Sequence, residues 1–359
     1  MENSTFGSLN ASQPNRRTIP DAIFQTICAV NGLFIRLSRN RIQKATSSLM
    51  FLAMLSLWPF WFYQFLCREF VFGVGRLHLY RIISVPNWVV YSLISLYWRF
   101  LFIMRNTDFE SVLQKRGRRL RDVAFPVICS SAIQVLHLDR FVRITEFSSR
   151  VCEVTFIFLD LIVMNFFLLY EDASNNILSM QLELSDSMNG AESLNLIRIL
   201  SGRDQIRRTI GRVNGLFAKP LAVFYSRLII VVLFAFSQLL GNHFTARETA
   251  ILIVCQICNL LQIFLLAKKG SRIIAHCAQL ESSVLKRYAN SEPNPASDNR
   301  HLLHVLQFRE EWDVLRVGCF VLNMPSFLRF LVFCITCVAV VLQFDYRLIK
   351  TMNSLVSFP

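Results

Sequence analysis

Charged residues are scarce in this sequence. They make up 17% of the 359 residues, whereas apolar residues make up 53%. An ordinary soluble domain has about 25% charged residues. So few charges cannot cover the surface of a water-soluble protein of this length, and the composition indicates an integral membrane protein.

The sequence also lacks the clusters on which enzymes and metal sites depend. We find no His and Glu cluster with metal-ligand spacing and no serine in the setting of a nucleophile. Cys255 and Cys258 have the spacing of a metal or redox pair, but they lie in an apolar run, and no second pair completes a tetrahedral site. We therefore predict no enzymatic activity, no metal and no other cofactor, and we interpret the ten cysteines as small buried side chains.

Acidic residues are outnumbered, which gives a net charge of +14. The basic residues lie between apolar runs rather than along one helix face, so the charge does not indicate a nucleic-acid partner. It indicates how the chain is oriented in a membrane, because Lys and Arg accumulate in cytoplasmic loops.

Long apolar runs are plentiful, and a membrane span needs about 20 such residues. Seven stretches qualify, the third being short and containing Pro126: Ser48–Leu66, Ile82–Met104, Val123–Leu138, Val151–Tyr170, Leu216–Leu240, Thr249–Ala267 and Met324–Phe344. The segment from Ala22 to Leu37 is amphipathic and too short to cross. We predict an all-α fold, a seven-transmembrane helical bundle.

The segments between these spans complete the predicted organisation. Glu171–Gly215 and Lys268–Asn323 are polar but have helical apolar periodicity, which predicts extended cytoplasmic helices. One of them, Leu303–Leu315, is predicted to join subunits. The expected domains are a cytoplasmic N-terminal segment (1–47), a six-span ligand-sensing bundle (48–267), a cytoplasmic loop with an assembly helix (268–323), and the seventh span with an external C-terminus (324–359).

Most Lys and Arg residues lie in the N-terminal segment and in the loops after the second, fourth and sixth spans. This bias predicts that the N-terminus is inside the cell and the C-terminus is outside. Asn3-Ser4-Thr5 and Asn10-Ala11-Ser12 are N-glycosylation sequons and favour the opposite orientation. Such short motifs arise often by chance in polar tails, so the charge bias decides the prediction.

The last span ends in Thr336-Cys337-Val338-Ala339-Val340-Val341-Leu342-Gln343-Phe344. This resembles the signature that closes insect gustatory receptors: Thr-Tyr, five apolar residues, then Gln-Phe. Upstream, Gly318-Cys319-Phe320-Val321-Leu322-Asn323 resembles the Gly-x-Phe-x-Leu-Asn that precedes the same helix in that family. Cys337 stands in place of the family's Tyr. Val338 stands where sugar-sensing members carry Glu, so the sugar branch is not expected.

The resemblance implies a homo- or heterotetrameric, tastant-gated cation channel in the plasma membrane of chemosensory neurons, surrounded by lipid. A bitter or other contact cue is the expected kind of small-molecule ligand. The last helix of each subunit would line a central pore, with Val340, Gln343 and Phe344 at the gate. The residues agree with this role, because a ring of Val closes a pore by dewetting and a ring of Gln amides solvates a passing cation.

A ligand pocket between the first six spans is a further implication. Asp160, in the middle of the fourth span, and the aromatic residues Trp61, Trp88 and Tyr91 are the candidates. Each also has a structural interpretation. Asp160 can pair with a polar group inside the bundle, and aromatic residues gather at membrane interfaces.

A G-protein-coupled receptor is the alternative. Asp139-Arg140-Phe141, after the third span, resembles that family's acid-Arg-Tyr motif. The last span, however, contains no Asn-Pro-x-x-Tyr, and the charge bias puts the N-terminus on the wrong side. A secondary transporter is disfavoured because no internal repeat is present.

The orientation can be tested with epitope tags at Met1 and Pro359 on intact cells. The charge bias predicts that antibody labels only the C-terminal tag before permeabilisation. Surface labelling of the N-terminal tag, or a glycosidase-sensitive mass shift abolished by substituting Asn3 and Asn10, would contradict the predicted topology.

Overall fold

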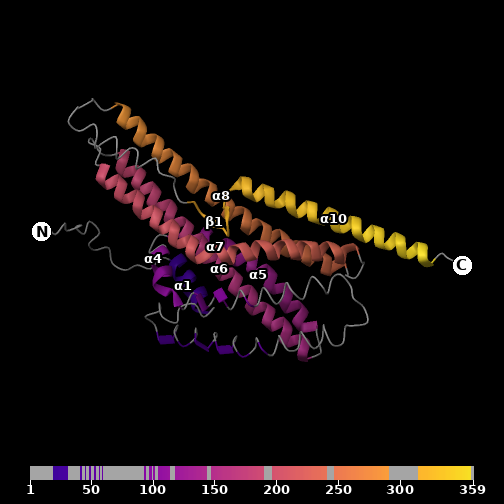
Figure 1. The fold of residues 1–359 in the computed structure, drawn as a ribbon. Helices are drawn as coiled ribbons and strands as arrows, with labels where there is room; N and C mark the ends of the chain where they lie inside the picture. The colour runs from indigo at the N-terminus through magenta and orange to yellow at the C-terminus, as the bar shows by residue number, and fades with distance from the viewer. Residues whose placement is uncertain are drawn as a thin grey trace.

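The computed structural model describes residues 19–30, 104–113, 118–143, 147–189, 196–240, 246–290 and 314–356, with scattered positions between 41 and 59 and between 93 and 101. Figure 1 shows these segments as a bundle of long helices with one short hairpin. The elements are α1 (Ile19–Val30), α4 (Asn106–Val112), α5 (Leu120–Arg143), α6 (Phe147–Asn189), α7 (Leu196–Leu240), α8 (Ala246–Asn290), β1 (Arg316–Val317), β2 (Phe320–Val321) and α10 (Met324–Val356). The all-α fold predicted from the sequence is confirmed.

The third to seventh predicted spans each lie within one helix: α5, α6, α7, α8 and α10, in that order. Pro126 lies inside α5, which is a helix of 24 residues. Most of the first two predicted spans lies outside the described residues. Within the part of the chain that the structure describes, no helix is both long and apolar enough to cross a membrane.

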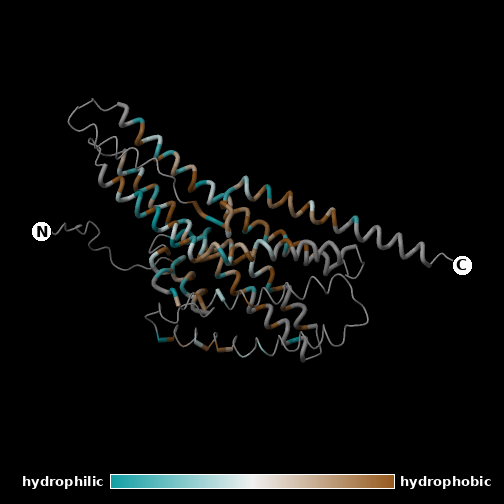
Figure 2. The backbone as a smooth tube through the Cα atoms, viewed as in Figure 1, coloured by the Kyte–Doolittle hydropathy of each residue, from teal (hydrophilic) through white to brown (hydrophobic). Residues whose placement is uncertain are grey.

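Three helices continue far beyond the predicted spans. The helix α6 has 43 residues, and α7 and α8 have 45 each, so α7 is about 68 Å long. A bilayer core is about 30 Å thick. In Figure 2 hydrophilic residues are frequent along the N-terminal part of α7 and the C-terminal part of α8. The predicted helical extensions at 171–189, 196–215 and 268–290 are therefore present.

The predicted assembly helix at 303–315 lies almost entirely outside the described residues. Only Val314 and Leu315 of that segment are described, and neither is helical. They lead into the antiparallel pair β1 and β2, in which Arg316 faces Val321 and Val317 faces Phe320. The hairpin was not predicted, because strands of two residues are too short to show an alternating pattern.

An aromatic cluster forms the centre of the core. Trp98 is fully buried, and its ring lies 5.4 Å from Phe109 of α4, 4.7 Å from Phe166 of α6 and 5.2 Å from Phe217 of α7, centroid to centroid. The first two contacts are edge-to-face, the arrangement that aromatic rings prefer. The cluster therefore joins α4, α6 and α7 at one point.

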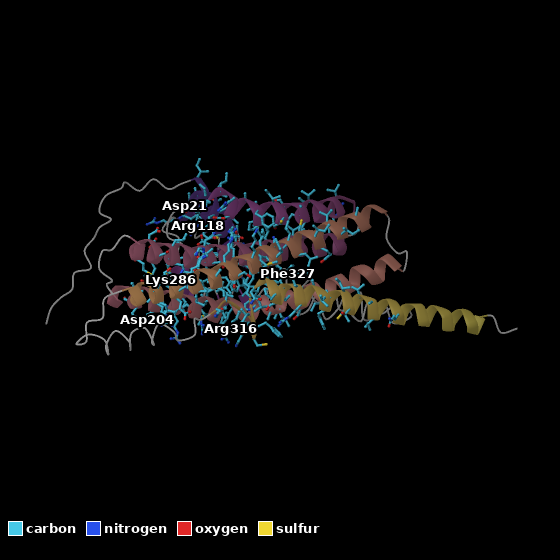
Figure 3. The ribbon with its side chains drawn as sticks, turned by 90° about the horizontal axis from the view of Figure 1, so that it is seen from above. Asp21, Arg118, Asp204, Lys286, Arg316 and Phe327 are labelled. Carbon is cyan, nitrogen blue, oxygen red and sulfur yellow. The ribbon has the colours of Figure 1, made fainter. Side chains whose placement is uncertain are left out.

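A polar layer lies beside this cluster, built around two consecutive acids of α6. Asp172 accepts two hydrogen bonds from Arg118, at 2.7 and 3.0 Å, and Asp21 of α1 accepts a third, at 2.8 Å. Figure 3 shows Asp21 and Arg118 side by side. The Arg118 guanidinium also lies over the ring of Phe24, with its central carbon 3.9 Å from the centroid. Arg118, which lies two residues before the start of α5, thus connects α1 to α6.

The other acid, Glu171, pairs with a residue of α8. Lys269 of α8 donates hydrogen bonds to Glu171 and to Asn175. Burial raises the pKa of Glu171, and the charge of Lys269 offsets only part of that increase. For Arg118, burial lowers the pKa, but Asp172 and Asp21 reverse this and raise it above its ordinary value. Both basic side chains are therefore held by acids within the protein.

Replacing Arg118 with Ala should reduce the free energy of unfolding by about 3 kcal/mol or more. The substitution leaves Asp21 and Asp172 buried without their cation, and breaking a buried pair in this way is strongly destabilising. The measurement is thermal unfolding of the purified protein in mild detergent.

Arg121→Ala is the matched control. Its side chain is 71% exposed and lies 3.7 Å from Asp122, so its loss should cost under about 1 kcal/mol. Equal effects of the two substitutions would show that the Arg118 contacts do not stabilise the bundle.

Candidate pore helix and its hairpin junction

The helix α10 has one face against the bundle and another that is exposed. Phe327, Cys334 and Val338 are buried against α7 and α8. Their spacing of seven and four residues places them on one side of a helix. In both Figure 1 and Figure 3 the C-terminal end of α10 extends past the other helices.

Most of the exposed side chains of α10 are apolar, although Arg329, Thr336 and Gln343 are exposed as well. Five of them are large apolar side chains: Leu328, Val332, Phe333, Ile335 and Val340. Val340 is 45% exposed, whereas Val338 is 9% exposed. An apolar surface of this extent indicates an interaction with protein or lipid.

The other motif residues of the last helix are placed as follows. Gln343 is exposed, as is Thr336. The Thr336 hydroxyl donates to the carbonyl oxygen of Val332 within the helix, at 2.9 Å. Phe344 lies in α10, but its side chain is outside what the structure describes. The structure therefore puts Val340 and Gln343 on exposed positions of the same helix.

The hairpin before α10 accounts for the second motif. Gly318 and Cys319 form a two-residue turn between β1 and β2, and Gly318 has a φ of +59°. Two-residue hairpin turns require a positive φ at the first central residue, which Gly adopts without strain. The backbone N–H of Leu322 then donates to the carbonyl of Leu315 at 2.7 Å and closes the hairpin.

Asn323, the last motif residue, begins α10. Its side-chain oxygen accepts a hydrogen bond from the backbone N–H of Ser326 at 2.8 Å. This is the N-cap interaction, which contributes about 1 kcal/mol to a helix. Phe320, in contrast, is exposed. The Gly and Asn of the motif therefore have local structural roles that set the direction in which α10 leaves the hairpin.

Backbone groups of the hairpin are hydrogen-bonded to the Asn214 side chain and to the backbone of α7. Asn214 donates to the carbonyl of Val314 at 2.7 Å and accepts from the N–H of Arg316 at 2.9 Å. One helical turn later, the carbonyl of Ala218 accepts from the N–H of Gly318 at 2.9 Å. The Asn214 side chain thus provides hydrogen-bond partners for the backbone groups of Val314 and Arg316, in the way that a neighbouring strand would.

The helix α8 holds the end of the hairpin. A Cβ atom at Gly270 would lie only 2.0 Å from the carbonyl oxygen of Leu322, so Gly270 is needed for the backbones to approach this closely. The next residue, Ser271, accepts a hydrogen bond from the N–H of Met324 at 2.8 Å. These anchors were missed by sequence reasoning, because a single Asn, Gly or Ser inside a helix carries no distinctive signal.

Three of the four residues predicted for the ligand pocket, Trp61, Trp88 and Tyr91, lie outside the described residues. Asp160 is described, half-buried in the middle of α6. Among the residues that the structure describes, no group of three or more His, Cys, Asp or Glu side chains could hold a metal ion.

Comparison with known proteins finds similarity in structure alone. No protein-family model and no curated protein matches the sequence. Solved structures of the insect olfactory receptor OR5 from Machilis hrabei do match. One has 13% sequence identity and a TM-score of 0.61, and another, in complex with eugenol, has 15% and 0.63. Each comparison covers 89% of this chain and 96% of that receptor. This chain therefore has the all-α fold of an insect olfactory receptor.

Replacing Gly270 with Ala should displace the hairpin from α8. The new Cβ would collide with the Leu322 carbonyl, and overpacking of this kind costs about 1–3 kcal/mol. Thermal unfolding of the purified protein would show the loss.

Gly211→Ala in α7 is the matched control, since nothing lies within 4 Å of its added Cβ. That substitution should stabilise the helix by about 0.5–1 kcal/mol. If the Gly270 variant were as stable as the Gly211 variant, the close contact between α8 and the hairpin would be refuted.

Proposed function

We propose that this chain is a gustatory receptor, a cation channel opened by a small-molecule tastant. The observation that best supports this proposal is the position of α10. The start of this helix is held by α7 and α8, and Val340 and Gln343 are exposed on its other side. The fold supports the proposal, since it matches an insect olfactory receptor along nearly the whole chain. That receptor was also solved with eugenol, a small molecule.

Four subunits, identical or mixed, would place their α10 helices around a central axis. The exposed apolar face of each helix would then be covered by its neighbours and by lipid. In a ring, Val340 would exclude water from the closed pore, and the Gln343 amides would replace part of the hydration shell of a passing cation. Phe344 follows directly and is assigned to the same gate.

The hairpin would transmit ligand binding to the gate. Asn214 and Ala218 of α7 hold the hairpin, and Ser271 of α8 holds the first residue of α10. A shift of α7 or α8 would therefore move the start of α10 with it. A ligand needs only to bind one arrangement of these helices more tightly than the other. The proposed pocket, which includes Asp160, lies among the helices that precede the hairpin.

The remaining assignments follow from the sequence. The receptor would cross the plasma membrane of a chemosensory neuron several times, with its N-terminus inside the cell. The closing motif favours taste over smell, and Val338 disfavours the sugar-sensing branch. The fold does not favour a G-protein-coupled receptor, because the structures that it matches are insect olfactory receptors.

Val340→Ser should produce current without ligand, because a hydroxyl hydrates a constriction that Val keeps dry. Gln343→Glu should increase the preference for cations over anions, since a charge in a narrow low-dielectric ring acts strongly on each ion. Whole-cell recording with a tastant panel measures both effects.

Val338→Ser is the matched control, since Val338 is buried against the bundle and lies off the exposed face. It should alter folding or expression more than conduction. Val340 and Gln343 variants that reach the surface and conduct as the parent does would remove α10 from the pore.

A further inference from the structure

A single turn of α8 connects α6 to the start of α10. Lys269 donates hydrogen bonds to two side chains of α6. The next residue, Gly270, lies so close to the end of the hairpin that an added Cβ would be 2.0 Å from the Leu322 carbonyl oxygen. Ser271 then accepts a hydrogen bond from the N–H of Met324, the first residue of α10, at 2.8 Å. Three consecutive residues of α8 therefore contact α6, the hairpin and α10 in turn.

The contact with α6 is a buried ion pair with a second acceptor. Glu171 and Asn175 lie one helical turn apart, and both accept from the Nζ of Lys269, Asn175 at 2.9 Å. The side chains of Lys269 and Glu171 are only 15% and 10% exposed. Separating such a pair would leave two buried charges without partners, which is strongly unfavourable. We therefore expect α6 and α8 to move together at this level.

The same face of α6 leads from Lys269 to the proposed ligand pocket. Asp160, a residue of that pocket, lies eleven residues before Glu171 in the same helix. Eleven residues of an α-helix place two side chains within about 20° of each other and about 16 Å apart along the axis. The helix α6 contains neither proline nor glycine, and kinks in helices mostly occur at such residues. A displacement of α6 beside Asp160 would therefore reach Glu171 with little loss.

We propose that Lys269 is a positioning residue that links α6 to the gate helix α10. A movement of α6 would pass to Lys269, and Gly270 and Ser271 would carry it to the hairpin and to the first residue of α10. This assignment rests on the proposed channel function and names the residue through which ligand binding would act on the gate. Loss of Lys269 should leave the pore itself intact and weaken its connection to the ligand.

The structural test is hydrogen exchange of the purified protein in mild detergent, read by mass spectrometry. In Lys269→Met the backbone amides of Leu322 and Met324 should exchange several-fold faster than in the parent, because their docking site on α8 opens more often. Lys268→Met is the matched control, since Lys268 is the preceding residue of α8 and is exposed. Its exchange should equal that of the parent.

The functional test is whole-cell recording of the same variants. Lys269→Met should lower the maximal tastant-evoked current by about fivefold or more, the lower end of the effect that coupled sites have on each other. Combined with Val340→Ser, it should leave the ligand-independent current as it is in Val340→Ser alone, whereas a folding defect would lower both currents. Exchanging the two charges, with Glu171→Lys and Lys269→Glu in one chain, should restore part of the evoked current.

The two measurements separate this proposal from the channel proposal. Exchange in Lys269→Met that equals exchange in Lys268→Met refutes the positioning role, whatever the currents are. A conducting parent whose evoked current survives Lys269→Met refutes the link and leaves the channel intact. A parent that never conducts, while its exchange responds to Lys269→Met, supports the positioning role and contradicts the channel. Glu171→Gln, which removes the other charge of the pair, decides both measurements should Lys269→Met fail to fold.

Discussion

The path of α10 depends on one close backbone contact, between Gly270 of α8 and the carbonyl of Leu322. No side chain fits there, since even a Cβ would lie 2.0 Å from the oxygen. The hairpin is therefore pressed against α8 while Asn214 and Ala218 hold it to α7. The Asn323 cap then begins α10 immediately beyond the contact. A helix fixed at one end in this way can leave its remaining face exposed, as the apolar side chains of α10 are.

The acids Glu171 and Asp172 support this junction from within the bundle. Consecutive residues of a helix point in different directions, so one pairs with Lys269 of α8 and the other with Arg118. Lys269 directly precedes Gly270. The ion pair that joins α6 to α8 thus lies next to the point where the hairpin docks, and Asp172 extends the polar layer to α1 through Arg118 and Asp21.

Much of the fold could be predicted from the sequence, because long apolar runs and helical periodicity extend over many residues. The third to seventh predicted spans each fall within one helix, and the predicted polar extensions are helical at 171–189, 196–215 and 268–290. The hairpin could not be predicted, because its strands have two residues each. The Arg118 and Asn214 contacts could not be predicted either, since they join residues 54 to 102 positions apart in the chain. For the candidate site, the motif singled out the segment around the start of α10, and the structure shows that Gly318 forms a turn there and Asn323 a cap.

We propose that this chain forms an ion pathway lined by its last helix. The most direct test is single-channel recording of the purified protein in planar lipid bilayers, with a panel of small-molecule tastants. We expect discrete cation currents whose open probability rises with an active tastant. A protein that inserts into the bilayer in folded form and stays electrically silent throughout, in the parent and in Val340→Ser alike, would contradict it.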